Sequence, residues 1–272
     1  MTLISALGFV LLIAGQFQER RPVIKLALLV DRQFGSVALM GVVIGMMMYG
    51  SAYMIPQFLS AIAGYDALQS GEIVLLSGIP SLILMPFTPF LIRNVDIRVA
   101  VSCGLMAMMG SCLIDTVLTA DAVGHDFVHS QLLRGVGAIF AFLFLNQAAI
   151  GSVPARDAGD AAGLFSACRN IGGSLALAGI ATIQDQRSWF HSRRLEESLN
   201  ANSVRLQDYM ANLSLSGGPD VAMRKLAATI QREALVMTYN DLFWILAMTI
   251  LAVTPLVLFL RPLQNKTPVA MH

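Results

Sequence analysis

Long apolar segments separated by short polar turns recur along the whole chain. Seven of them stand out, and they cover residues 2–15, 36–58, 70–91, 99–118, 128–149, 161–183 and 237–260. About 20 apolar residues in a helix cross the hydrocarbon core of a bilayer. We therefore expect six full spans, and we expect the first segment to be the end of a longer helix. A spanning segment must satisfy its own backbone hydrogen bonds, which favours helices. The pattern predicts an all-α membrane protein.

Composition agrees with this class. The chain has 272 residues, of which 56% are hydrophobic and 13% are charged, whereas soluble domains carry about 25% charged residues. The net charge of +1 gives no reason to expect a nucleic-acid partner. The three cysteines lie inside apolar segments and the four histidines lie in loops or at helix ends, without metal-ligand spacing. The sequence therefore predicts no enzyme activity, no metal site and no cofactor.

Basic residues gather in alternate loops. The loops after the first, third and fifth segments and the C-terminal tail hold Arg20, Arg21, Lys25, Arg32, Arg93, Arg98, Arg156, Arg261 and Lys266. The loops at 60–69 and 119–127 hold no basic residue. Because basic residues are enriched in cytoplasmic loops, we expect the N-terminus outside and the C-terminus in the cytoplasm.

This topology divides the chain into four parts. We expect a partial transmembrane helix, a cytoplasmic amphipathic linker, a six-helix bundle containing an external loop, and a cytoplasmic tail, at residues 1–16, 17–34, 35–262 (loop 185–233) and 263–272. The loop carries seven basic residues against six acids, and loops of this length weigh less in the charge rule. We expect two amphipathic helices in it, joined around residues 214–220.

Two arginines stand well inside predicted helices, Arg134 and Arg169. An arginine near the centre of a spanning helix costs about 2.5–3.5 kcal/mol even on the insertion scale, so we expect both inside the bundle. Asp115, Glu72 and Asp241 are the acids at a depth similar to that of Arg134. They are candidate partners, and the alternative for each is a solvated place near the outer interface.

Small residues mark the expected helix contacts. Arg169 stands in a stripe of mostly small residues on one helix face, which predicts a packing seam, and Arg169 either locks helices together or serves a transport pathway. Close packing is also expected at Gly41, Gly45, Gly135, Gly137, Gly172 and Gly173.

Several motifs occur in an order that resembles a known family. They are Ile55-Pro56-Gln57-Phe58-Leu59, Pro86 with Asp96-Ile97-Arg98, Leu133-Arg134-Gly135-Val136-Gly137, Arg169-Asn170-Ile171-Gly172-Gly173-Ser174 and Asn240-Asp241-Leu242-Phe243-Trp244. Together they resemble the C-terminal half of a fourteen-helix drug:proton antiporter of the EmrB/QacA type, in the major facilitator superfamily. Two positions depart from the family pattern: Pro89 stands where glycine is usual, and Glu72 lies in a stretch that is usually apolar.

The resemblance implies a fold and an activity. The fold would be the six-helix C-terminal bundle of the superfamily plus one partial preceding helix. The complete protein would work by alternating access in the plasma (bacterial inner) membrane, using the proton gradient to export small hydrophobic or cationic compounds. Its partners would be the lipid bilayer, the missing N-terminal half in the same or another chain, a periplasmic adaptor and an outer-membrane channel.

The resemblance also implies roles for single residues. Arg134 would be a pathway or coupling residue with Asp115 as its charge partner, and Arg169 would lie near the cavity. Further residues with implied roles are Tyr53 and Gln57 at the outer cavity, Glu72 and Asp241 as outer-side charges, and Asp96 and Arg98 in the cytoplasmic gating loop. Two other functions stay open: a non-transporting membrane scaffold or assembly subunit, and an inactive truncated transporter. The intramembrane arginines favour transport, because a scaffold has no need of buried charge.

Overall fold

The computed structural model describes residues 26–198, 207–208, 210–211 and 218–260, and these residues form helices and short connections with no strand among them. Six helical stretches of this part of the chain are long and apolar enough to cross a membrane. The prediction of an all-α membrane protein with a six-helix bundle is therefore confirmed. The predicted partial helix at 1–16, the first half of the linker (17–25) and the tail at 263–272 lie outside the described residues.

The first described span is α2 (Arg32–Phe58), preceded by a 3-10 turn, η1 (Leu26–Val30). The carboxylate of Asp31 caps α2 by accepting hydrogen bonds from two backbone N–H groups of its first turn, which have no partner inside the helix. The span ends in a π-helical turn, η2 (Leu59–Ala63), followed by Gly64 with φ of 70°. Glycine suits this place because a side chain disfavours the left-handed conformation.

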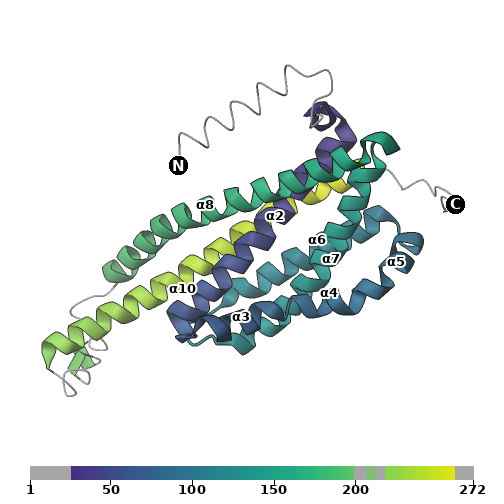
Figure 1. Cartoon of the computed structure of the whole chain (residues 1–272). Coiled ribbons are helices and arrows are strands. Elements are labelled where there is room, and N and C mark those ends of the chain that lie inside the picture. Colours follow the sequence, from purple (N-terminus) through teal and green to yellow (C-terminus); the bar gives the residue numbers. More distant parts are fainter. Residues whose placement is uncertain (1–25, 199–206, 209, 212–217, 261–272) are drawn as a thin grey trace, which may run out of the picture.

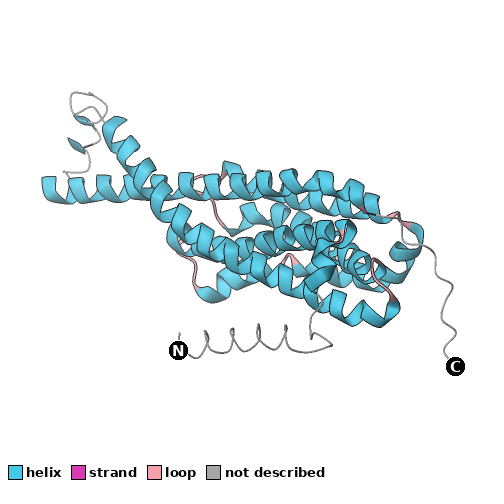
Figure 2. Cartoon of the chain, turned by 90° about the horizontal axis from the view of Figure 1, so that it is seen from above, coloured by secondary structure: helices cyan, strands magenta, loops and turns pink. Residues whose placement is uncertain are grey.

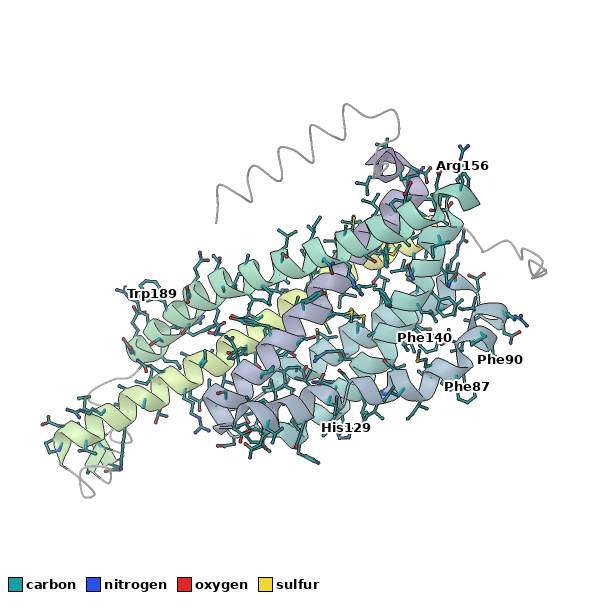
Figure 3. The ribbon with its side chains drawn as sticks, in the orientation of Figure 1. Phe87, Phe90, His129, Phe140, Arg156 and Trp189 are labelled. Atoms are coloured by element: carbon teal, nitrogen blue, oxygen red, sulfur yellow. The ribbon has the colours of Figure 1, made fainter. Side chains whose placement is uncertain are left out.

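The second span contains Pro80, Pro86 and Pro89 and is broken into short pieces. It consists of α3 (Ala67–Leu75), α4 (Gly78–Leu84), η3 (Met85–Phe87) and α5 (Thr88–Asn94). Proline lacks the N–H group that would continue the helical hydrogen bonds. Little of this span is buried, and Phe87 and Phe90 point away from the bundle (Figure 3).

The other spans follow as one hairpin and two long helices. They are α6 (Ile97–Ile114) with η4 (Asp115–Val117), η5 (Gly124–Phe127) with α7 (Val128–Gly151), η6 (Ala155–Asp157) with α8 (Ala158–Ser198), and α10 (Pro219–Val253) with η7 (Thr254–Phe259).

The region at 185–233 differs from the expectation. In place of a loop with two separate amphipathic helices, α8 continues unbroken to Ser198 and α10 already begins at Pro219. Both helices project beyond the other four on the same side (Figures 1 and 2). The prediction missed this because the apolar pattern ends where lipid contact ends, whereas a helix can continue with polar residues in water.

Glycines bring α2 and α8 into close contact. A Cβ atom at Gly45 would overlap the main-chain carbonyl of Arg169, and one at Gly172 would overlap the carbonyl of Val42. Gly41 and Gly173 meet aromatic rings of the facing helix. The same kind of approach occurs on α7, where Gly135 meets α4 and Gly137 meets α6. These are the contacts expected from the glycine spacing.

Arg32 and Arg98, two of the basic residues that we expect in cytoplasmic loops, lie at the same end of the bundle. The guanidinium of Arg32 lies 4.4 Å from the ring centre of Phe259. Arg98 donates from Nε to the carbonyl oxygen of Leu260 over 2.7 Å. The starts of α2 and α6 therefore lie beside the end of η7.

Candidate functional site

A buried ion pair joins the hairpin of α6 and α7. Arg134 Nη2 and Asp115 Oδ2 are 2.5 Å apart, and the two residues are 5% and 1% exposed. Asp115 ends α6, and Arg134 lies in the second turn of α7. At this burial the two charges neutralise each other, and removing one of them leaves the other in an apolar surrounding.

Gln131 completes the cluster. Its Oε1 accepts a hydrogen bond from Arg134 Nη1 over 2.9 Å, and its Nε2 donates to the carbonyl of Ile73 over 3.2 Å. The ion pair is thereby tied to α3, the first piece of the broken span. One polar atom of the guanidinium, Nε of Arg134, stays buried without a hydrogen-bond partner among the described residues.

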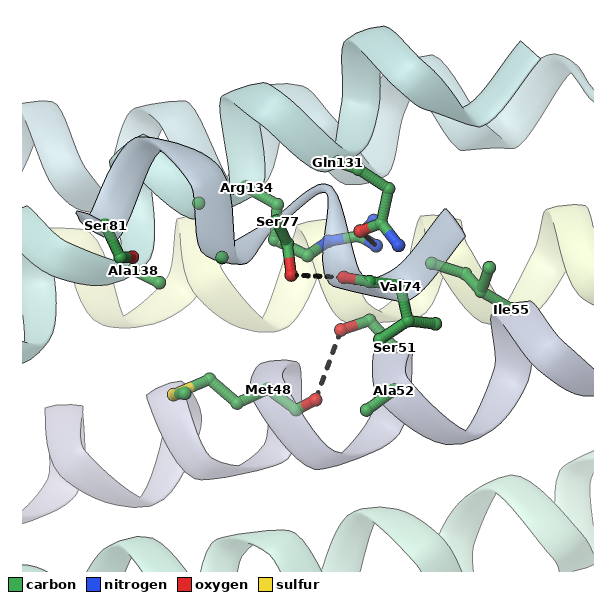
Figure 4. A pocket seen from close by; sticks show the side chains of 12 residues that line it. Met48, Ser51, Ala52, Ile55, Val74, Ser77, Ser81, Gln131, Arg134 and Ala138 are labelled. Atoms are coloured by element: carbon green, nitrogen blue, oxygen red, sulfur yellow. Dashed lines mark hydrogen bonds between the residues drawn. The ribbon is translucent and has the colours of Figure 1, made fainter. Parts of the chain in front are cut away.

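Arg134 also borders a cavity of about 290 Å³, which Asp115 does not line. Figure 4 shows the lining, which comes from α2, from α3 and α4 with Ser77 between them, and from α7: Met48, Ser51, Ala52, Ile55, Val74, Ser77, Gly78, Ser81, Gln131, Arg134, Gly135 and Ala138. The hydroxyls of Ser51 and Ser77 donate to carbonyls of their own helical turns. The guanidinium therefore stands between a carboxylate inside the bundle and an open cavity beside it.

A second cavity of about 530 Å³ lies next to the first and shares Met48, Ser81 and Ala138 with it. It continues along α5, α7 and α8 and includes Arg169 and Phe142. The Arg169 guanidinium lies 4.8 Å from the ring centre of Phe142. The two arginines thus border neighbouring parts of one groove.

The other two candidate acids do not contact Arg134. Glu72 is exposed on α3. Asp241 on α10 contacts the projecting part of α8, where its Oδ2 lies 2.7 Å from Nε2 of His191 and 3.4 Å from Nη1 of Arg187. Only Asp115 of the three candidates is the partner of Arg134.

Tyr53 and Gln57 line neither of the two cavities described above. Tyr53 is exposed, and Gln57 accepts a hydrogen bond from the hydroxyl of Tyr239 over 3.4 Å. Gln184 donates to the same hydroxyl over 3.3 Å. Here Gln57 joins α2 to α10, and its place in an outer cavity stays a prediction.

Asp96 and Arg98 make structural contacts at the start of α6. Asp96 caps this helix by accepting a hydrogen bond from the N–H group of Arg98 over 2.8 Å. Arg98 makes the contact with Leu260 described above. Their role in a gating loop is not tested by these contacts.

Sequence reasoning missed Gln131 and Arg232. A glutamine three residues before a buried arginine shares its helix face, which is a signal that was present. Arg232 of α10 donates from Nη2 to the carbonyls of Ile62 and Ala120, over 3.1 and 2.6 Å, and so joins the ends of two other spans to α10. In the part of the chain that the structure describes, no group of three or more His, Cys, Asp or Glu side chains is placed to hold a metal ion.

A family comparison gives these features a context. The sequence profile of the Major Facilitator Superfamily matches residues 2–177.

Curated relatives cover almost all of this chain. The "Colistin resistance protein EmrB" of Acinetobacter baumannii is 26% identical over 265 residues, which are 95% of this chain and 52% of the relative. The "Multidrug export protein EmrB" of Escherichia coli is 25% identical over 96% of this chain and 52% of its own length. The "Fatty acid resistance protein FarB" of Neisseria gonorrhoeae is 23% identical over 92% of this chain and 50% of its own length. The resemblance to the EmrB/QacA type agrees with these matches, and the chain spans about half the length of these relatives.

Proposed function

The chain belongs to the major facilitator superfamily, and we propose that it forms one half of a proton-coupled multidrug efflux antiporter that works by alternating access. Relatives named for multidrug export and resistance support efflux, and six apolar helices support a place in the membrane. The superfamily points to a transporter and not to an enzyme. In transporters built from two such bundles, the substrate site lies between the halves, so the activity belongs to this bundle together with a second one.

The buried Arg134–Asp115 pair beside a cavity carries this proposal. With Asp115 ionised, the guanidinium is held inside the bundle by the carboxylate. A proton on Asp115 removes the negative charge and weakens the contact, which frees Arg134 to turn toward the cavity that it already borders. Intramembrane acids and arginines mark proton relays and substrate pathways. Proton binding and the shape of the groove would be coupled through this one contact.

The remaining features follow from the same proposal. The end of the bundle that holds Arg32, Arg98 and Arg156 would face the cytoplasm, and the projecting ends of α8 and α10 would lie outside. The energy source would be the proton gradient, without a cofactor. The exposed apolar side chains of α3 to α5 would contact lipid or the second bundle. A periplasmic adaptor and an outer-membrane channel stay predictions from the resemblance.

The proposal is tested by reconstituting a complete transporter. The chain is co-expressed with the uncovered half of the Acinetobacter relative in cells that lack their own multidrug exporters, and accumulation of the cationic dye ethidium is measured. We expect low accumulation only with both halves, and a return to the exporter-free level with Arg134→Ala or Asp115→Asn. Arg156→Ala, at an exposed arginine of the loop before α8, is the control that keeps efflux.

Proton coupling has its own measurement. In proteoliposomes that contain both halves, an imposed pH gradient should drive dye transport, and Asp115→Asn should remove the dependence on the gradient. If Arg134→Ala exports dye as well as the unchanged pair does, the pathway role of Arg134 is wrong.

A further inference from the structure

Arg169 is a charge without a counter-charge in the groove. No ion pair of the described part of the chain includes it, and its Nε is buried without a hydrogen-bond partner there. Arg169 lies about 16 Å along the helix axis from the start of α8, at 1.5 Å per residue. This distance is close to half the thickness of the hydrocarbon core. Arg134 has Asp115 as its partner, whereas Arg169 has no acidic partner among the residues that the structure describes.

The groove around Arg169 is apolar apart from this guanidinium and two hydroxyls. Its lining comes from α2, α4, α5, α7 and α8 and contains no carboxylate. In the neighbouring cavity the charge of Arg134 is neutralised by Asp115. The two cavities together therefore carry one positive charge, which is that of Arg169. In a surrounding of low dielectric constant such a charge attracts an anion far more strongly than it does in water.

The guanidinium of Arg169 makes no hydrogen bond among the described residues, so its N–H donors are available to a ligand. The charged group lies over the ring of Phe142. Stacking of a guanidinium on an aromatic ring uses the face of the group and leaves its N–H donors in the plane, where they match two oxygen atoms of one anionic group. An apolar groove of about 530 Å³ has room for the hydrophobic body attached to such a group.

We propose that Arg169 and Phe142 form a subsite for the anionic group of an amphipathic small molecule, such as an aryl sulfonate or a carboxylate on an apolar body. This inference rests on the proposed transport function, because it names the substrate class of the same groove. The family resemblance implies substrates that are often cationic, and the charge of this groove favours the opposite sign for the part of the substrate that meets this half.

The test compares two probes that share an aromatic body. 8-Anilino-1-naphthalenesulfonate carries a sulfonate, and N-phenyl-1-naphthylamine is its uncharged analogue. Each is titrated by fluorescence into the 272-residue chain in phosphatidylcholine nanodiscs, with empty nanodiscs as background. We expect Arg169→Gln to weaken binding of the sulfonate about tenfold or more, as expected for loss of a hydrogen-bonded charge pair, and to leave the uncharged probe within about twofold.

Matched variants separate binding from folding. The Arg169 side chain can be changed without touching the helix contact, because Gly45 meets the main-chain carbonyl of this residue. Arg169→Lys keeps the charge but lacks the planar pair of donors, so it should restore only part of the affinity. Phe142→Leu should weaken sulfonate binding because the guanidinium loses its aromatic contact. Arg156→Gln removes an exposed arginine and should change neither probe. Circular dichroism of each variant checks that the helices are intact.

Several outcomes would overturn the proposal. Equal weakening of both probes by Arg169→Gln would show that the residue shapes the groove and does not bind the anion. Unchanged sulfonate affinity would have the same consequence. Displacement of the sulfonate by a few mole per cent of phosphatidylglycerol would assign the subsite to a lipid headgroup. Because the assay measures binding and needs no transport, its failure is distinct from a failure of dye efflux by the reconstituted pair.

Discussion

Arg134 and Arg169 have the same side chain, and their surroundings give them different properties. Arg134 is 5% exposed and touches a carboxylate and an amide. Arg169 contacts an aromatic ring and borders an apolar groove. A charge that is neutralised inside the protein stabilises one arrangement of helices, whereas a charge without a partner is available to a ligand. We therefore expect changes at the two positions to affect different measurements.

At the residue scale, a double-mutant cycle measures how much unfolding free energy the protein loses when the Arg134–Asp115 ion pair is broken. Asp115→Asn should lower the free energy of unfolding by about 3–5 kcal/mol, because it leaves Arg134 buried and charged. Arg134→Gln together with Asp115→Asn should recover part of the loss, since no buried charge remains. The measurement is unfolding in detergent followed by circular dichroism.

The exposed pair Arg193–Glu197 on the projecting part of α8 is the control. Arg193→Gln should change stability by no more than about 1 kcal/mol. If Arg193→Gln lowered the free energy of unfolding as much as Asp115→Asn does, burial would not explain the effect at the Arg134–Asp115 pair.

The pairing of Arg134 with Asp115 has a signal in the sequence that was not used. In an antiparallel hairpin, residues at equal distances from the turn face each other, and the midpoint between these two positions falls within the turn that joins η4 to α7. Glu72 and Asp241 fail this criterion for the hairpin of Arg134. Depth alone selected three acids, and only topology separates them.

At the scale of the elements, the contact of α2 with α8 depends on glycine. Gly45→Ala places a methyl group onto the carbonyl of Arg169 and should cost about 1–3 kcal/mol through overpacking. Gly163 and Gly179 lie on α8 with open space where a Cβ would stand. Alanine at either position should be neutral or stabilise the helix by up to about 1 kcal/mol. Thermal unfolding midpoints of the three variants compare them directly, and a loss at Gly163 or Gly179 as large as that at Gly45 would contradict the contact.

Arg232 of α10 predicts a second effect on elements. Arg232→Ala removes the donor shared by the carbonyls of Ile62 and Ala120, so backbone amides at 60–66 and 118–124 should exchange with deuterium several times faster. Arg224→Ala, a neighbouring exposed arginine of α10, should leave their exchange unchanged. Hydrogen exchange with mass spectrometry measures both variants, and equal rates in the two would show that Arg232 does not hold these ends.

At the scale of the whole molecule, the sequence predicts the spans better than the ends of the helices. The length of the apolar segments was enough to predict the six spans. The continuation of α8 beyond residue 183 escaped notice because its exposed part carries Arg193, Arg194, Glu196 and Glu197, a composition that hydropathy assigns to a loop. The groove could not be predicted from the sequence either, because it depends on how five helices are placed in space.

The orientation in the membrane is open to a direct measurement. In a background with the native cysteines replaced by serine, Arg194→Cys and Arg156→Cys place one thiol at each end of α8, at exposed positions. A membrane-impermeant maleimide added to intact cells should label position 194, and it should label position 156 only after the membrane is permeabilised. The reverse pattern would invert the proposed topology.

The continuity of α8 has a mechanical consequence. The same helix that borders the groove at Arg169 extends unbroken into the projecting region around Trp189 (Figure 3). If a continuous helix tilts as a rigid body at the groove, each residue beyond is displaced in proportion to its distance along the axis. Events inside the membrane would therefore be transmitted to the aqueous side without any further joint, and a fluorophore attached near the tip would report on them.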